Sequence, residues 1–181
     1  MKNSEKHDKI LKGTYSFVET VLLGITCIAV IFVLAGRVAV IDGESMEPNL
    51  HDGDVVVIRT AYAMPQRGEI VAVGRAGGKN ASFVKRVIAL AGDEVFINFE
   101  THLITINGEV IPERYKVVDA LSVQGDLTYP ATVPEGCVFV LGDNRNDSLD
   151  SRFSEIGFIR QEEIAGVAVF RLLPFGQTQI R

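Results

Sequence analysis

The 181-residue sequence contains few of the residues that form disulfides, metal sites or nucleic-acid-binding surfaces. It has two cysteines, three histidines and no tryptophan. Cys27 lies within a long apolar run and Cys137 lies far along the chain, so we expect no disulfide between them, and their spacing is not that of a metal site. The formal net charge of −5 offers no basic surface to a nucleic acid. The composition therefore argues against a disulfide scaffold, a cysteine-bound metal and a nucleic-acid partner.

What the chain does have is apolar surface and glycine. Hydrophobic residues make up 47% and the mean hydropathy is +0.21, which is high for a soluble domain and points to a membrane segment. Seventeen glycines and no tryptophan suit many turns and short strands better than a helical bundle. The length fits one domain of ordinary size and an attachment segment.

A long, predominantly apolar run covers residues 16–36 and contains a single charge, Glu19. At about 1.5 Å per residue it is long enough to cross the roughly 30 Å apolar core of a bilayer. Four lysines precede the run and only Arg37 follows closely. The positive-inside rule then predicts a cytoplasmic basic N-terminus over 1–15, a transmembrane signal anchor over 16–36 and an extracytoplasmic domain over 37–181.

Two other interpretations of the run remain open. It is also compatible with a cleaved signal peptide, in which Ala35 would be a small residue near the cleavage site, although its apolar core exceeds the usual length. It is compatible, too, with the buried core helix of a soluble protein. After residue 36 the chain carries 14 Lys and Arg against 20 Asp and Glu, so the domain itself is acidic.

Beyond residue 37 the pattern changes to short β-branched and alternating runs separated by Gly, Pro and Asn turns. Asn107-Gly108 is a strong signal for a two-residue hairpin turn. Residues 112–134 are less regular and predict a loop-rich excursion. The predicted fold class is mostly β, an antiparallel barrel or sandwich after the transmembrane helix. The predicted strands are Asp54–Arg59, Glu69–Val73, Ser82–Leu90, Glu94–Asn98, Leu103–Ile106, Val138–Leu141 and Ala165–Leu172.

A serine lies at a predicted tight turn just after the apolar run. The octet Gly43–Leu50 places Ser45 between Gly43, which relieves steric limits, and Pro48, which restricts φ. Such a turn can expose a hydroxyl and aim backbone N–H groups at a substrate oxygen. A plain structural turn is the alternative.

A lysine on a predicted strand is the candidate base. Alternation places Phe83, Lys85 and Val87 on one face, so apolar neighbours would desolvate the Lys85 ammonium and lower its pKa. A lysine near neutrality can act as general base. The alternatives are a solvated lysine or one paired with a carboxylate. His51 and His102 are weaker candidates, since His51 would need a tight fold-back and His102 lies in a predicted turn.

A charged loop follows the strand that ends at Leu141. Residues 143–152 are rich in Asp, Asn and Arg, but a cation at the third position and the lack of a closing glutamate do not fit a calcium loop. Arg145 and Arg152 could pair with Asp143, Asp147 or Asp150 and stiffen the loop. Ser148 or Ser151 could then hydrogen-bond a neutral lysine. These candidates complete three chemical elements: a serine turn, a strand lysine and a charged loop.

Taken in order, these segments resemble the type I signal (leader) peptidases, membrane-bound serine proteases with a Ser–Lys dyad. Residues 43–50 are similar to the family's serine box, 53–57 to the box after it, 85–93 to its lysine box and 142–152 to its last box. The resemblance covers essentially the whole chain and is closest to compact, single-anchor bacterial members. The departures are modest: Asn49, Ala89, Ala91 and Asp147 stand where Thr, Gly, Pro and Asn are usual.

The resemblance implies a role for each matching residue. Ser45 would be the nucleophile, Lys85 the general base and Ser148 the hydroxyl that orients Lys85, while Asp150 and Arg152 would support the loop. Some members bind the oxyanion with a hydroxyl two residues before the nucleophile. In this sequence that position is a glycine, so the oxyanion hole would depend on backbone N–H groups, that of Ser45 first.

The resemblance also implies the substrate and the place. The chain would remove signal peptides from exported preproteins at the plasma membrane, cutting after small residues at −1 and −3, close to the lipid surface and without metal or organic cofactor. Met46, Leu50 and Phe83 are candidates for lining the substrate groove, and Met46 and Leu50 are equally compatible with contact to lipid or a place in the core.

Two other function classes stay open. One is a relative with the same dyad and another substrate, such as the self-cleaving repressor proteases, although the membrane span and acidic balance do not favour it. The other is a catalytically silent, membrane-tethered β module that binds partners.

Overall fold

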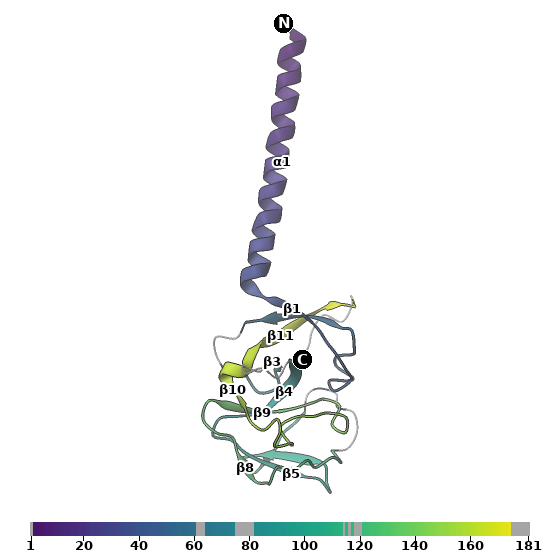
Figure 1. Cartoon of the computed structure of the whole chain (residues 1–181), viewed down its shortest axis with the longest axis vertical. Helices are drawn as coiled ribbons and strands as arrows, with labels where there is room; N and C mark the ends of the chain where they lie inside the picture. Colours follow the sequence, from purple (N-terminus) through teal and green to yellow (C-terminus); the bar gives the residue numbers. More distant parts are fainter. Residues whose placement is uncertain are drawn as a thin grey trace. The chain divides into compact units, whose positions relative to one another are not determined.

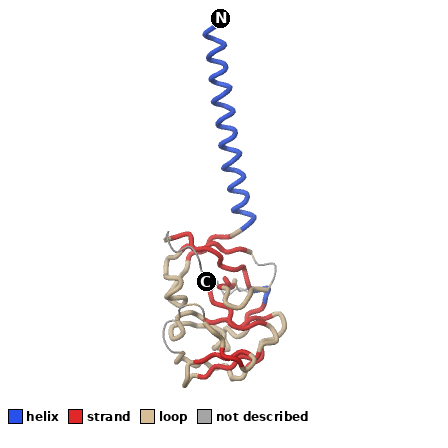
Figure 2. Tube along the Cα trace, turned by 180° about the vertical axis from the view of Figure 1, so that it is seen from behind, coloured by secondary structure: helices blue, strands red, loops and turns tan. Residues whose placement is uncertain are grey.

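The computed structural model of the chain describes residues 2–60, 64–74, 82–113, 115, 117 and 121–174. It contains two compact units, Met1–Arg37 and Val38–Arg181 (Figures 1 and 2). The first is a single helix and the second is built almost entirely of strands.

Helix α1 runs from Lys2 to Ala35, so it begins well before the apolar run and includes most of the basic segment predicted over 1–15. Its stretch Lys12–Val30 is long and apolar enough to cross a membrane, and the side chains of this stretch are exposed rather than buried in protein. Among the described helices it alone meets this test. A core helix of a soluble protein would bury an apolar face, and this one does not.

The larger sheet has seven strands in the order β1-β2-β11-β3-β4-β9-β10, and the pairings from β2 through β10 are antiparallel. Many of its neighbouring strands are far apart in the sequence, because the C-terminal strand β11 lies between β2 and β3. The bounds are β1 (Arg37–Val40), β2 (Val55–Arg59), β3 (Ile70–Val73), β4 (Phe83–Leu90), β9 (Cys137–Leu141), β10 (Ile159–Arg160) and β11 (Ile164–Leu173).

The smaller sheet has four strands in the order β7-β6-β5-β8, with bounds β5 (Glu94–Asn98), β6 (Leu103–Ile106), β7 (Glu109–Val110) and β8 (Ala131–Thr132). Asn107 and Gly108 join β6 to β7 with φ values of 53° and 81°, the positive pair that a type I′ hairpin turn requires. A short 3₁₀ helix, η1 (Gln161–Glu163), precedes β11.

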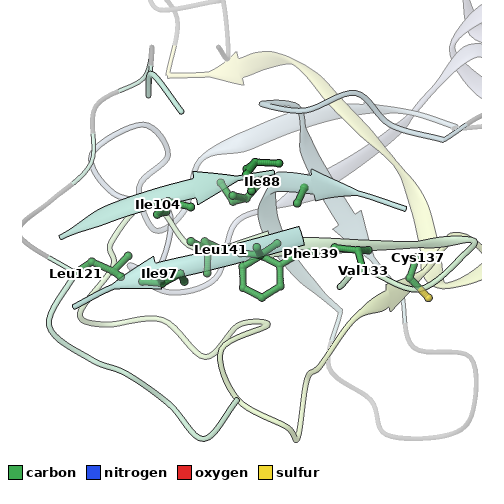
Figure 3. Close-up of a cluster of buried hydrophobic side chains, with 11 residues drawn as sticks. Ile88, Ile97, Ile104, Leu121, Val133, Cys137, Phe139 and Leu141 are labelled. Carbon is green, nitrogen blue, oxygen red and sulfur yellow. The ribbon is translucent and has the colours of Figure 1, made fainter. Parts of the chain in front are cut away.

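The hydrophobic core has three parts, and the large sheet is covered on both faces. One cluster joins Ile88, Phe139 and Leu141 of the large sheet to Ile97 and Ile104 of the small one (Figure 3). A second lies under the serine turn, and a third groups valines of β3, β4 and β9. Strands β3 and β9 are buried along their whole length, as their continuous apolar sequences indicate.

The sequence-based fold class is confirmed: the chain is mostly β and antiparallel after one N-terminal apolar helix. All seven predicted strands exist, with ends that differ by one residue at most. An eighth strand, β7, is the strand predicted to return at Val110–Ile111 after the Asn107-Gly108 turn. Three further strands were missed, β1, β8 and β10. They have two to four residues each, too few for a periodic pattern to stand out.

Candidate active site

The serine turn, residues 43–50, connects β1 to β2. Gly43 has φ +90°, and its N–H donates to Asp52 Oδ1 at 2.8 Å. Within the turn, Leu50 N–H donates to Met46 O at 2.9 Å, a helix-like closure. Met46 and Leu50 are almost fully buried in the second core cluster. The structure therefore gives these two side chains the core place that the sequence left open, and they anchor a turn on which Ser45 is half-buried.

Lys85 lies on β4 and reaches the turn across the sheet. Its Nζ is 2.7 Å from Ser45 Oγ and 5.7 Å from the centre of the Phe83 ring, on the face that strand alternation predicted. The side chain is only 4% exposed. Burial is the largest influence on its pKa and lowers it to about 8, against the opposing effects of the Asp150 and Asp143 carboxylates, while the charge of Arg152 lowers it further. The sequence-based expectation of a depressed lysine pKa is confirmed.

The charged loop, residues 142–152, packs directly against the serine turn. Asn144 N–H donates to Ser45 O at 3.1 Å, and Asn144 Nδ2 donates to Glu44 O at 3.2 Å. Gly142 lies so close to the turn that a Cβ at this position would be 2.6 Å from Ser45 O and would also overlap the Ser148 side chain. The loop thus fixes the backbone on which the serine hydroxyl is carried.

Ser148 is brought to this junction, but the structure does not bond it to Lys85. Its Oγ is buried and has no hydrogen-bond partner among the described residues. It packs over Gly142, next to the carbonyl of Ser45. A buried hydroxyl without a partner costs folding free energy, so its presence needs another reason.

Asp150 and Arg152 form a fully buried ion pair that holds the loop in shape. Arg152 Nε donates to Asp150 Oδ1 at 2.8 Å, and Gly142 N–H donates to Asp150 Oδ2 at 3.0 Å. Arg152 Nη1 also donates to Val123 O at 2.7 Å, which ties the loop to the excursion before β8. This is one of the pairings that the sequence proposed.

A second buried ion pair, Arg86 with Asp143, was missed. Arg86 Nε and Nη2 donate to the two Asp143 oxygens at 2.7 and 2.6 Å, and both side chains are fully buried. Arg86 also stacks over the Tyr115 ring at 4.0 Å. A signal was available, since Arg86 lies between Val84 and Ile88 on an apolar face where a cation requires a partner.

The partner proposed for Arg145 was wrong. Arg145 pairs with Glu113 and donates from Nε to Gly142 O at 3.0 Å, because Asp143 is already taken by Arg86. The histidines are elsewhere: His51 Nδ1 lies 4.0 Å from Asp54 Oδ2, and His102 Nδ1 lies 3.4 Å from Leu121 O. Within the described part of the chain, no group of three metal-binding side chains comes together.

Comparison with known proteins defines the class to which this chain belongs. The model of the family described as "Signal peptidase, peptidase S26" matches residues 14–173. The chain belongs to this family of serine peptidases, as the resemblance of its sequence boxes predicted.

The relatives carry one name in particular, signal peptidase I. The Bacillus licheniformis protein of that name is 33% identical over 96% of both chains, and signal peptidase I S of Bacillus subtilis (strain 168) is 32% identical over 97% of this chain and 95% of its own. A crystal structure of a signal peptidase I from Enterococcus faecalis V583 shares 32% identity, covers 60% of this chain and all of its own, and has a TM-score of 0.47.

Proposed function

We propose that the chain is a type I signal peptidase that removes signal peptides from exported preproteins by means of a Ser45–Lys85 dyad. The observation that supports this most strongly is the 2.7 Å contact between Lys85 Nζ and Ser45 Oγ, made by a buried lysine with a lowered pKa. Membership of the signal peptidase family and the single apolar helix support the substrate class and the anchor.

The chemistry follows from the two groups in contact. Neutral Lys85 accepts the proton of Ser45 as Oγ attacks the scissile carbonyl, and the leaving amine then takes a proton from Lys85. The resulting acyl-enzyme is hydrolysed when Lys85 takes a proton from the attacking water and returns it to Ser45 Oγ as the ester bond breaks. Each proton transfer needs heavy atoms within about 2.6–3.2 Å, which the Ser45–Lys85 distance meets.

The Ser45 backbone N–H is the proposed oxyanion donor. Among the described residues it makes no hydrogen bond, whereas the Ser45 carbonyl is engaged by Asn144. A donor that is held in place and not yet used costs no reorganisation when charge develops on the substrate oxygen.

The substrate and its approach are inferred from the family and the site together. The preprotein binds as an extended segment with small residues at −1 and −3, and Phe83, half-buried beside Lys85, contributes to the groove. Ser148 orients Lys85, and Asp150 with Arg152 supports the loop. The excess of lysine before the apolar run supports a cytoplasmic N-terminus and a catalytic domain outside the plasma membrane.

The test is cleavage of a preprotein with an Ala-x-Ala site by the detergent-purified chain, with mass spectrometry of the product ends. Wild type should cut once, after the second Ala, and Ser45→Ala and Lys85→Ala should each abolish the cut. Ser154→Ala, which removes an exposed hydroxyl, is the control and should cut as wild type does. Full activity in Lys85→Ala would refute the dyad, and no cutting by folded wild type with lipid present would favour a silent binding module.

A further inference from the structure

The serine turn carries one side chain that reaches from the turn to the buried ion pair beside the lysine. Asn49 Nδ2 donates to Asp143 Oδ2 at 2.8 Å. Asp143 is held by Arg86 through two hydrogen bonds, and Arg86 directly follows Lys85 on β4. From this geometry we propose that Asn49 is a positioning residue, whose amide locks the serine turn to the lysine strand and so sets the distance from Ser45 to Lys85.

The Arg86–Asp143 end of this connection is fully buried and held by several contacts. Arg86 and Asp143 are fully buried, and the guanidinium is further held by Gly68 O, to which Nη1 donates at 2.7 Å, and by the ring of Tyr115. A buried bidentate ion pair of this kind has a single geometry. A side chain that bonds to Asp143 is therefore held at a fixed position relative to β4, the strand that carries Lys85.

The near end is rigidly joined to the nucleophile. Asn49 N–H donates to Met46 O at 3.0 Å, and Met46 follows Ser45 directly and is buried. On the other side of Ser45, the charged loop holds Glu44 O and Ser45 O through Asn144. Hydrogen bonds thus hold the turn on both sides of the Ser45 hydroxyl, and Asn49 makes the one on its C-terminal side.

Loss of the Asn49–Asp143 hydrogen bond should alter catalysis more than substrate binding. The Asn49 amide contacts the chain itself, so KM should change little. A displacement of Ser45 Oγ of about 1 Å from its base is enough to lower the rate by about a hundredfold. Because Asn144 still holds the turn, we expect kcat to fall by about ten- to a hundredfold rather than to vanish.

The experiment compares two side chains of the same shape at this position. Asn49→Thr retains a donor and Asn49→Val does not, so Asn49→Val should lose kcat with KM nearly unchanged, and Asn49→Thr should exceed it by about tenfold. Both are measured as the full chain in detergent, with unfolding midpoints recorded beside the kinetics. If Asn49→Val unfolds at the assay temperature, Asn49→Ser and Asn49→Ala make the same comparison with less bulk.

The chain offers a matched control. Asn107 Nδ2 donates to Asp93 Oδ1 at 2.8 Å, and Arg67 Nη2 donates to Asp93 Oδ2 at 2.7 Å, so an Asn–Asp–Arg arrangement with the same residue types, but with an exposed arginine that makes a single bond, exists at the hairpin of the small sheet. Replacement of either asparagine by aspartate removes the donor and sets two carboxylates against each other. Asn49→Asp should lower kcat strongly, and Asn107→Asp should leave it unchanged.

Two outcomes would overturn the inference: wild-type kcat in Asn49→Val, or equal losses in the Thr and Val variants, which would show that a hydrogen-bond donor at this position does not restore the rate. The inference depends on the proposed function, and its failure is distinguishable. If Ser45→Ala and Lys85→Ala abolish cleavage while Asn49→Val does not alter it, the dyad stands and the positioning role falls. If those two variants cut normally, the proposed function itself is wrong.

Discussion

The ionisation of Lys85 is decided by two opposing effects on one side chain. Asp150 and Asp143 favour the ammonium, and burial at 4% exposure favours the neutral amine. Burial is the larger effect, so the pKa falls from 10.5 to about 8. Under the proposed function, a lysine base that is neutral in an appreciable fraction of molecules near neutral pH needs no histidine beside it.

The pH dependence of cleavage should report this lysine. Under the proposed function the reactive form is neutral Lys85, so kcat/KM should rise with pH and level off above an apparent pKa of about 8. The measurement is kcat/KM for a short peptide substrate between pH 6 and 10. A profile that levels off near pH 6–7 instead would indicate a histidine base.

Substitution of Ser148 should have opposite effects on stability and on activity. Its buried Oγ has no hydrogen-bond partner among the described residues, so Ser148→Ala removes an uncompensated polar group and should raise the free energy of unfolding by about 1 kcal/mol. If the hydroxyl orients Lys85 during catalysis, the same variant should lower kcat by about ten- to a hundredfold. Chemical denaturation and steady-state kinetics on one preparation measure both, and unchanged kcat would exclude the orienting role.

At the scale of the elements, the serine turn and the charged loop interlock around Gly142. Gly142→Ala would place a methyl against Ser45 O and the Ser148 side chain, so one of the two segments must move. We expect a destabilisation of about 1–3 kcal/mol from the overlap and a loss of about a hundredfold or more in kcat.

Gly74→Ala is the matched substitution for that prediction. Its nearest contact would be Ala165 Cβ at 3.8 Å, which is ordinary packing distance. Denaturation midpoints and kcat should be close to wild type for Gly74→Ala. Equal effects of the two substitutions would mean that the close approach at Gly142 has no special importance.

The strands and their turns were predictable because their signals are local. A β-branched run such as 55–58 or an Asn-Gly pair such as 107–108 specifies its own conformation within a few residues. The same holds for the serine–lysine face, since alternation along β4 assigns Lys85 and Phe83 to one side. The pairing of Lys85 with Ser45 was predicted from the resemblance of residues 43–50 and 85–93 to the family's sequence boxes.

The choice of ionic partners was not predictable in the same way. Asp143 had several arginines available, and its partner, Arg86, is 57 residues away. Only the pairing of β4 with β9 decides between them, after which Arg145 is left for Glu113. Likewise, the apolar character of Met46 and Leu50 fits lipid, a groove or a core equally, and only the packing of β2, β3 and β11 around them makes them core.

At the scale of the whole molecule, the helix and the β domain are separate compact units. A chain that begins at Val38 should therefore keep the fold of the domain and its kcat/KM for a short soluble peptide. It should cleave a membrane-inserted preprotein at least about a hundredfold more slowly, because the anchor raises the effective concentration of enzyme at the membrane. Parallel assays on the peptide and on preprotein in vesicles test this, and equal losses on both substrates would mean that the helix is needed for the fold.

The distribution of the site along the chain has a consequence for when activity first appears. Lys85 lies 40 residues after Ser45, and the charged loop begins about 60 residues after Lys85. The three segments meet only after β4 has paired with both β3 and β9. Under the proposed function and topology, a chain that is still crossing the membrane would have a serine of ordinary reactivity and a charged lysine. Under the proposed function, folding is itself the activation step, and a newly made protease is harmless to its neighbours until its sheet has closed.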